Sequence, residues 1–168
     1  SKGEDFSYSE EEFREINKAL MILNNINYYI DQLYRNKGRL NIEDKWILSR
    51  FYSTVKECKA LYNSYKFSDV VQKLEEFIVF ELSRKYIQMI RDRADDVYDV
   101  LNEIRTGLLK LLAPITPFVT ESIWQKLREK KIVKEESVHL SDWPKIDEKL
   151  IDKKLEGEFN LIRALIEK

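Results

Sequence analysis

The stretch from Leu108 to Leu127, LLKLLAPITPFVTESIWQKL, constrains the fold more than any other part of the chain. Leucines three and four residues apart before Pro114 indicate a helix with a wide apolar face. That helix must end near Pro114, because proline lacks an N–H group and disfavours the α conformation in the residue before it. Thr116 can then cap a second helix with Pro117 at its first position, where the missing N–H costs nothing. The stretch therefore predicts a helix, a sharp corner and a second helix, whose expected buried residues are Val119, Ile123, Trp124 and Leu127.

Apolar residues recur at helical spacing in four further segments. Ser9 followed by Glu12 is a capping-box pattern, and the helix that it opens is expected to run to about Arg35. The other helices are expected over about 41–65, 68–93 and 147–168, with the helix that ends at Pro114 starting near Asp95. The sequence thus predicts an all-α fold, an antiparallel bundle of five to six helices. Residues 1–136 are expected to form the bundle, and residues 137–168 an extended segment and a last helix that packs on the bundle or leaves it.

The composition leaves little room for catalytic or metal chemistry. The four glycines are scattered, so the chain has no glycine-rich phosphate loop. One histidine, His139, and one cysteine, Cys58, supply neither a metal-ligand set nor a nucleophile–base pair. Cys58 falls on an apolar helix face and is expected to be a small core residue. No apolar run reaches the roughly 18–20 residues of a membrane span, and no secretory signal opens the chain, so we expect a cytoplasmic protein.

The charge balance argues against a general affinity for nucleic acid. The chain has 29 basic and 30 acidic residues and a net charge of −1, so no long-range field attracts a polyanion. Binding of RNA would require a local patch of cations. The alternative function is a helical protein–protein interaction module without an RNA role, and the charge balance is its main support.

Four segments, taken in order, resemble one known family. They are DKWILSR at 44–50, ELSRKYIQMIRDR at 81–93, the 108–127 stretch and SVHLSDWP at 137–144. Together they are similar to the anticodon-binding domain of the class I aminoacyl-tRNA synthetases for isoleucine, valine and leucine. The 81–93 segment most resembles the isoleucyl enzymes of archaea and eukaryotes, and the valyl and leucyl enzymes are the alternatives.

The resemblance implies a piece excised from a larger enzyme. Class I synthetases carry catalytic signatures of the HIGH and KMSKS types on a separate module, and neither signature is present here. The chain is therefore expected to catalyse nothing and to bind no cofactor itself, with ATP and magnesium belonging to the missing module. Its opening residues, 2–7, resemble the segment that follows that module. The implied partners are the rest of the synthetase and the anticodon stem-loop of a tRNA, tRNA-Ile in particular, which the domain would position for aminoacylation.

Cations gather toward the end of the third expected helix, at Arg84, Lys85, Arg91 and Arg93. Arg84 and Arg91 are seven residues apart, which places them two turns apart on one helix face, with Lys85 beside that face. Cations so placed can hold RNA phosphates while aromatic rings stack on unpaired bases. The alternative is an ordinary solvated surface on which these cations pair with neighbouring acids.

The resemblance adds two residues on the first helix. In the related enzymes the anticodon is read between that helix and the far end of the helix expected to end at Arg93. Asn25 matches an asparagine of the family, and Tyr29 follows one turn later. The resemblance implies that Asn25 bonds a base edge and that Tyr29 stacks on a base. The chain departs from the family pattern at Asn24, where tryptophan is usual.

Other prominent side chains are expected to be structural. The spacing places Trp46, Trp124 and Trp143 in buried or anchoring positions. Arg50 is expected to pair with an acid on a neighbouring helix. The cations between residues 126 and 134 could follow an RNA backbone, but glutamates interrupt them and a solvated face is expected.

Overall fold

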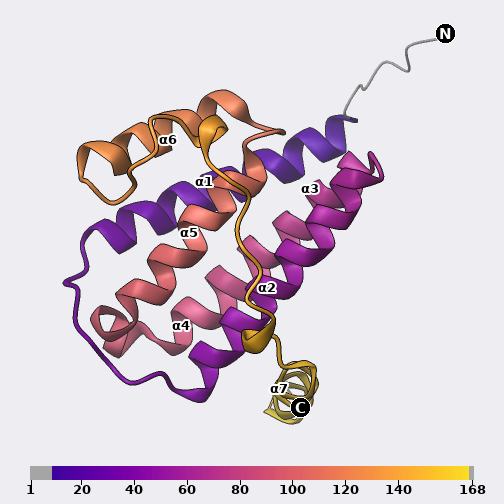
Figure 1. Ribbon diagram of the computed structural model, residues 1–168. Helices are drawn as coiled ribbons and strands as arrows, with labels where there is room; N and C mark the ends of the chain where they lie inside the picture. The colour runs from indigo at the N-terminus through magenta and orange to yellow at the C-terminus, as the bar shows by residue number, and fades with distance from the viewer. Residues whose placement is uncertain (1–8, 167–168) are drawn as a thin grey trace, which may run out of the picture.

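The chain is built from helices joined by short connections (Figure 1). The computed structural model describes residues 9–166, with side chains up to residue 161. Every regular element in that range is helical, which confirms the predicted all-α class. The α-helices are α1 (Glu10–Asp31), α2 (Ile42–Asn63), α3 (Phe67–Glu75), α4 (Ile87–Met89), α5 (Tyr98–Leu112), α6 (Pro117–Glu129) and α7 (Lys153–Ile166). A π-helical segment, η1 (Glu76–Tyr86), joins α3 to α4, and a 3-10 segment, η2 (Arg91–Val97), joins α4 to α5.

The third predicted helix is a continuous rod over residues 67–89, made of α3, η1 and α4. It ends before the predicted Arg93, because Ile90 leaves helical geometry at φ −97° and ψ 4°. Arg93, at φ −138° and ψ 25°, then turns the chain away from the rod axis. The predicted end of this helix was therefore wrong, and the two arginines that follow Ile90 lie on a tight turn.

The helices alternate in direction, as the prediction of an antiparallel bundle requires. α1 runs in the same direction as the rod, since Lys18 Nζ lies 3.5 Å from Glu75 at the start and Tyr34 N donates to Asp95 at the end. α2 and α5 run the other way, and Tyr62 of α2 donates to the Leu111 carbonyl near the carboxyl end of both helices. The fully buried Arg105 of α5 pairs with Asp31 in the last turn of α1 at 2.8 Å.

α5 and α2 approach each other closely at Gly107. A Cβ atom at this position would lie 2.4 Å from Cζ of Phe51, so no larger side chain fits there without moving that ring. Trp46 and Trp124 are 1% exposed and belong to the same core, which confirms their expected burial. Cys58 is buried in that core as well.

The predicted corner is present, with two corrections. α5 ends at Leu112 and α6 begins at Pro117, as the two prolines require. Thr116 does not cap α6 with its side chain; its hydroxyl lies 3.3 Å from the Leu112 carbonyl instead. The expected burial of Val119 was wrong, since it is 45% exposed. Thr120 takes the buried position, where its hydroxyl donates to the Thr116 carbonyl, and the buried stripe of α6 is Thr120, Ile123, Trp124 and Leu127.

The segment after α6 lies across the bundle in a less extended form than predicted. Residues Val138–Leu140 form a 3-10 turn, which buries Val138 and leaves Leu140 exposed. Glu121 of α6 holds this turn by accepting hydrogen bonds from Ser137 Oγ and Val138 N. Trp143 is 41% exposed and rests against Tyr62, with ring centres 5.1 Å apart, so it anchors the segment by a ring contact at the surface and is not buried.

A buried polar cluster attaches α7 to the bundle. Glu156 accepts hydrogen bonds from Ser49, Ser53 and Arg50 of α2 at 2.6–2.9 Å. Arg50 also pairs with Glu81 of η1 at 2.7 Å, which confirms its predicted role in an ion pair. The helix thereby packs against α2 at the lower edge of the molecule (Figure 1). Residues 1–8, including the segment that resembles a domain junction, lie outside the described part of the chain.

Acid should loosen α7 through Glu156. Burial acts to raise the pKa of Glu156, but hydrogen bonds from Ser49, Ser53, Arg50 and Lys153 outweigh it and lower the pKa to about 2. A depressed pKa stabilises the fold above the ordinary value of 4.5, and this stabilisation is lost as the pH falls from 4.5 toward 2. Urea unfolding of the wild type and Glu156→Gln should show a stability difference that shrinks over this window. A difference independent of pH would contradict the assignment.

Candidate nucleic-acid interface

A hollow opens where the last turns of α1 meet η2. Its volume is about 390 Å³, and its walls are Tyr29, Leu33 and Asn36 on one side and residues 91–96 on the other. Tyr29 is half-buried and Arg91 is exposed. Burial raises the pKa of Tyr29, and the nearby Arg91 offsets part of that rise. The phenol therefore stays protonated at neutral pH and presents both a ring face and an O–H donor to whatever enters the hollow.

Carboxylates share the walls of this hollow with the arginines. Asp92, Asp95 and Asp96 all line it, and Asp95 is occupied on one oxygen by the Tyr34 amide at 2.9 Å. A bare anion would meet repulsion from these groups. A planar polar group with N–H donors suits them better, because the carboxylates can accept from its edge while Tyr29 stacks on its face.

A second set of cations lies closer to the amino-terminal ends of α1 and the rod than the hollow does. The Arg84 guanidinium is 4.9 Å from the ring centre of Phe80, and Lys18 Nζ of α1 is 5.9 Å from the same ring. Phe80 is 39% exposed, so the ring and both cations are open to solvent. Such cation–π contacts hold a flexible side chain in one place.

Asn25 lies between these two groups on α1. It is exposed, seven residues after Lys18 and four residues before Tyr29, so the three side chains share one helix face. We call the strip formed by Lys18, Asn25 and Tyr29 of α1 with Phe80, Arg84 and Arg91 the α1–rod seam. Of the residues singled out from the sequence, Tyr29 and Arg91 line one hollow. Arg84 lies with Lys18 at the Phe80 ring, and Asn25 shares the α1 face of Lys18 and Tyr29.

Two members of the seam escaped the sequence analysis. Lys18 and Phe80 were not singled out, although each lies at helical spacing from a residue that was. Lys18 is two turns before Asn25, and Phe80 is one turn before Arg84. Only the packing of α1 against the rod shows that the Lys18 and Arg84 side chains meet at a single ring.

Lys85 lies on another side of the rod. Its Nζ is 5.8 Å from the ring centre of Trp46 in α2, and Phe159 of α7 stacks on that same tryptophan at 4.5 Å. Adjacent residues of a helix point in different directions, so the neighbours Arg84 and Lys85 cannot serve one narrow seam. Lys85 faces the α2–α7 contact.

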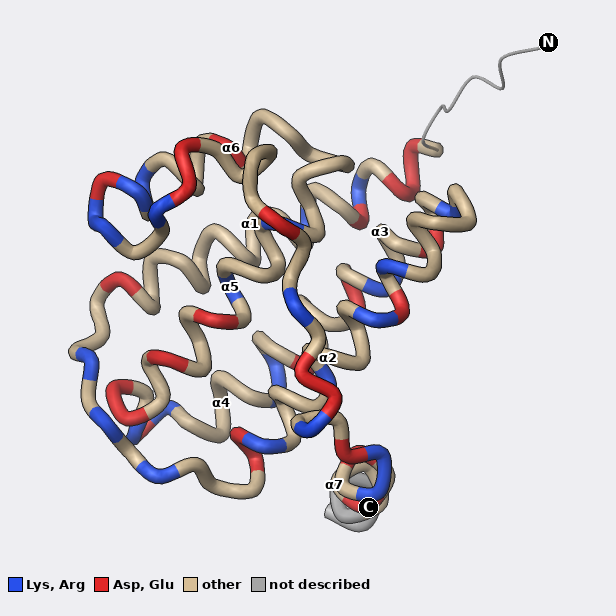
Figure 2. Tube along the Cα trace, viewed as in Figure 1, with Lys and Arg blue, Asp and Glu red and all other residues tan. Residues whose placement is uncertain are grey.

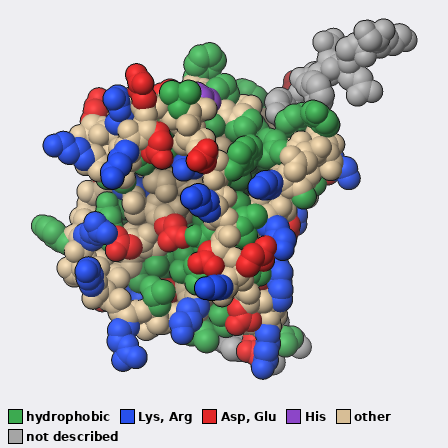
Figure 3. Space-filling model, viewed as in Figure 1, with side chains coloured by type: hydrophobic (Ala, Val, Ile, Leu, Met, Phe, Trp, Pro, Cys, Tyr) green, Lys and Arg blue, Asp and Glu red, His purple; other side chains and the backbone are tan. Residues whose placement is uncertain are grey.

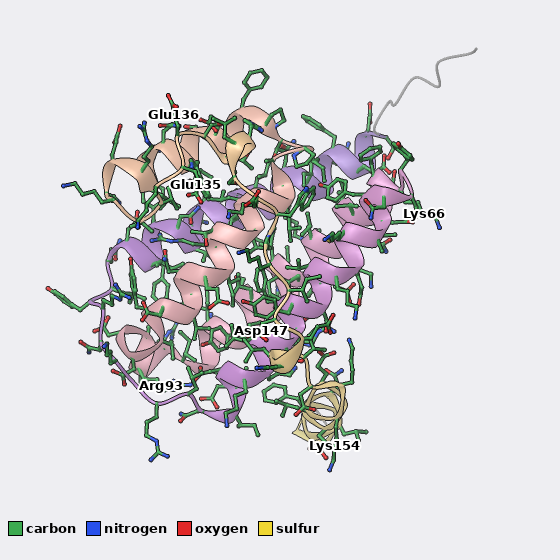
Figure 4. All side chains as sticks on the ribbon, in the orientation of Figure 1. Lys66, Arg93, Glu135, Glu136, Asp147 and Lys154 are labelled. Atoms are coloured by element: carbon green, nitrogen blue, oxygen red, sulfur yellow. The ribbon has the colours of Figure 1, made fainter. Side chains whose placement is uncertain are left out.

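Arg93 lines the hollow, but its guanidinium is held by the protein itself. Its Nη2 lies 2.8 Å from Asp44 and also bonds Glu43, both at the start of α2; Figure 4 labels Arg93 at the lower left of the bundle. The hydrogen bond to Asp44 is the main cause that raises the pKa of Arg93. Asp44 is fully buried and accepts from Tyr86 Oη at 2.7 Å as well. Arg93 therefore follows the alternative stated for these cations, in which they pair with acids of the protein.

Neither a metal centre nor a membrane span is found in the described residues. No group of three or more His, Cys, Asp and Glu side chains converges as a metal would need, between residues 9 and 161. No helix in the described part of the chain is long and apolar enough to cross a bilayer.

Comparison with known proteins gives one family. Residues 44–168 match the family described as "Anticodon-binding domain of tRNA ligase". The chain is 33% identical to the isoleucine–tRNA ligase of Methanocella arvoryzae over 98% of its own length and 17% of that protein. It is 36% identical to that of Methanothrix thermoacetophila over 98% of the chain and 18% of the relative. With that of Pyrococcus horikoshii the identity is 40% over 74% of the chain and 12% of the relative. The chain thus spans less than a fifth of these curated relatives.

Removing the Arg93 side chain should destabilise the fold, whereas removing Arg91 should not. Arg93→Ala leaves the buried Asp44 carboxylate without its cation, and loss of one partner of a buried pair costs about 3–5 kcal/mol. Arg91 is exposed and has no ion-pair partner among residues 9–161, so Arg91→Ala should change stability by less than about 0.5 kcal/mol. Chemical denaturation of both variants decides the question. Equal, small effects would show that Arg93 does not support the fold.

Proposed function

This chain belongs to the family of anticodon-binding domains of tRNA ligases, and from that premise we propose that its α1–rod seam binds the anticodon stem-loop of a tRNA. The relatives named above are all isoleucine–tRNA ligases, which favours tRNA-Ile as the substrate. In this proposal the chain is one domain of a cytoplasmic isoleucine–tRNA ligase. ATP and magnesium act in another module of that enzyme, and this domain positions the tRNA without catalysing a reaction.

The placement of Tyr29 and Arg91 in one open hollow carries the proposal. Unpaired bases are recognised by stacking on aromatic rings and by hydrogen bonds to their edges. Tyr29 supplies the ring, and the carboxylates of Asp92 and Asp96 can accept from the amino groups of a base. Arg91 is exposed at the rim, where a guanidinium can reach a phosphate. Asn25, one turn earlier on the same face of α1, offers both donors and acceptors to a second base edge.

The local arrangement answers the objection from net charge. A chain of net charge −1 attracts no polyanion at long range, but many of its acids are used inside the protein. Asp31, Asp44, Glu81 and Glu156 all pair with arginines of the fold. Lys18 of the seam pairs with Glu75, whereas Arg84 and Arg91 are exposed, form no ion pair within residues 9–161 and can meet phosphates at short range.

Arg91→Ala should weaken RNA binding and reduce its dependence on salt. Each phosphate contact contributes about 0.7–0.9 to the slope of log K against log salt concentration, so losing one contact should make the slope less negative by about that amount. The measurement is a titration of the chain with a tRNA-Ile transcript at several salt concentrations. Arg14→Ala is the matched control, because it removes one exposed cation near the other end of α1. A flat salt response of the wild type would contradict RNA binding, and equal effects of both variants would contradict the role of Arg91.

One observation favours a protein contact on another face. A hollow of about 300 Å³ is lined by Phe13, Ile16 and Leu20 of α1 together with residues 115–119 at the corner before α6. Phe13 is 62% exposed and Phe118 is 89% exposed, and hydrophobic side chains reach the surface along the upper edge of the molecule (Figure 3). Exposed apolar clusters of this kind mark interaction sites. Because the relatives are more than five times longer than the chain, we propose that another module of the same ligase covers this hollow.

Hydrogen exchange tests this contact. The amides of the first turns of α1 and α6 should exchange more slowly in the complete ligase than in this chain alone, because the covering module shields them. Phe118→Ser should speed their exchange in the complete ligase while leaving the stability of the isolated chain nearly unchanged, since Phe118 is exposed in it. Identical exchange in the two contexts would show that the hollow stays open.

A further inference from the structure

The connection between α1 and α2 carries a row of cations that the sequence analysis did not single out. Residues 32–41 contain Arg35, Lys37 and Arg39 at alternate positions, and all three are exposed. Figure 2 shows these cations as blue bands separated by tan along the loop. The loop is a spacer between two helices, and helix formation does not require three cations in it.

Hydrogen bonds to η2 hold the loop in an extended form. Asn36 N donates to the Asp95 carbonyl at 3.1 Å, and Gly38 N donates to the Asp96 carbonyl at 3.3 Å. Tyr34 N donates to the Asp95 side chain at 2.9 Å. The amides of alternate residues 34, 36 and 38 thus all donate to η2 and hold one edge of the loop against it.

Asn36 and Gly38 face η2 and the hollow, whereas Arg35, Lys37 and Arg39 beside them are exposed. Asn36 lines the hollow beside Tyr29. Gly38 lies so close to η2 that a Cβ atom would be 2.4 Å from the Asp96 Cβ and 2.9 Å from its carbonyl oxygen. Side chains alternate along an extended chain at about 3.3 Å per residue. Arg35, Lys37 and Arg39 therefore share the outer face, about 6.6 Å apart, a spacing suited to successive phosphates of one RNA strand.

Little in the protein neutralises this row. Lys37 and Arg39 form no ion pair with any residue between 9 and 161. Arg35 lies 2.8 Å from Asp99, but both side chains are more than half exposed, and such pairs contribute little. The backbone carbonyls of Asp95 and Asp96 accept from the loop, and one side-chain oxygen of Asp95 accepts from the Tyr34 amide. Neither carboxylate forms an ion pair with the three cations within residues 9–161.

We propose that the row Arg35, Lys37 and Arg39 binds the phosphate backbone of the RNA whose loop bases enter the α1–rod seam. The inference rests on the proposed function and adds to it a second contact surface, continuous with the hollow through Asn36. Phosphate contacts set the position of a nucleic acid without reading its sequence. The row therefore fixes where the strand lies, and Tyr29 with its neighbours acts on the bases so presented.

The double variant Lys37→Ala/Arg39→Ala tests the row. The probe is an unmodified RNA hairpin with the stem and loop of the tRNA-Ile anticodon arm, titrated into this chain while fluorescence anisotropy is followed. Loss of two phosphate contacts should make the salt slope less negative by about 1.4–1.8, so that the defect in affinity is about tenfold larger at 50 mM than at 200 mM salt. The melting temperature should not change, because both side chains are exposed.

A matched control distinguishes the loss of local phosphate contacts from the effect of a lower net charge on hairpin binding. Lys59→Ala/Lys66→Ala also removes two exposed cations, one in the last turns of α2 and one just before α3. Figure 4 shows Lys66 on the opposite side of the molecule from Arg93. This double variant should bind the hairpin as the wild type does.

Gly38→Ala provides a test without any change in charge, because a methyl group must push the loop off Asp96. It should weaken hairpin binding and speed exchange of the Asn36 amide, whereas Gly157→Ala, with nothing within 4 Å, should do neither.

The outcomes distinguish the two proposals. If Arg91→Ala weakens binding while the Lys37/Arg39 and Lys59/Lys66 variants behave alike, the row is not a contact surface and the seam remains one. Equal losses in both double variants would also overturn the row, since net charge alone would explain them. If the wild type shows no salt-dependent affinity for the hairpin, RNA binding fails and the row fails with it.

Discussion

The buried carboxylate of Asp44 is the interaction on which the geometry of this domain depends. It is fully buried at the start of α2 and accepts hydrogen bonds from Asn41 N, Tyr86 Oη and Arg93 Nη2 at 2.7–2.8 Å. A buried carboxylate is stable only when it is paired and hydrogen-bonded, so these three donors must converge. They come from the end of the loop, the rod and the turn after it, and their convergence fixes the relative position of all three.

The candidate interface is built on this junction. Because Arg93 reaches back to Asp44, η2 turns beneath the end of α1, and the hollow beside Tyr29 lies between them. The same turn places Asp95 and Asp96 where they hold residues 34–38 in extended form. One buried charge therefore supports both the seam that would receive bases and the row that would receive phosphates. In a chain of net charge −1, RNA binding would then depend on local cations, with Asp44 paired to Arg93 and with Asp92 and Asp96 left to accept from bases.

Features that depend on neighbouring residues in the chain were predictable. Two prolines specify the α5–α6 corner wherever the helices pack, because proline geometry is local. Periodicity likewise predicted the burial of Trp46 and Trp124, and four ordered segments identified the family. Errors arose where a tertiary contact competes with a local preference. Val119 is exposed because α6 packs on the bundle through Thr120, Ile123, Trp124 and Leu127. The rod ends at Met89 because Ile90 leaves helical geometry, and Arg93 then pairs with Asp44.

The sequence by itself thus determined the helical class, the corner, the family and most of the cations to consider, since helical spacing and chain order contain that information. Only the tertiary structure decided which cations act together. Arg84 and Arg91 share a seam with α1, Lys85 faces Trp46, and Arg93 is held by Asp44. It alone showed that Arg35, Lys37 and Arg39 face outward, because that depends on hydrogen bonds between residues some 60 positions apart. Spacing along a chain indicates which residues share a face, but which face meets which neighbour depends on the packing of the whole bundle.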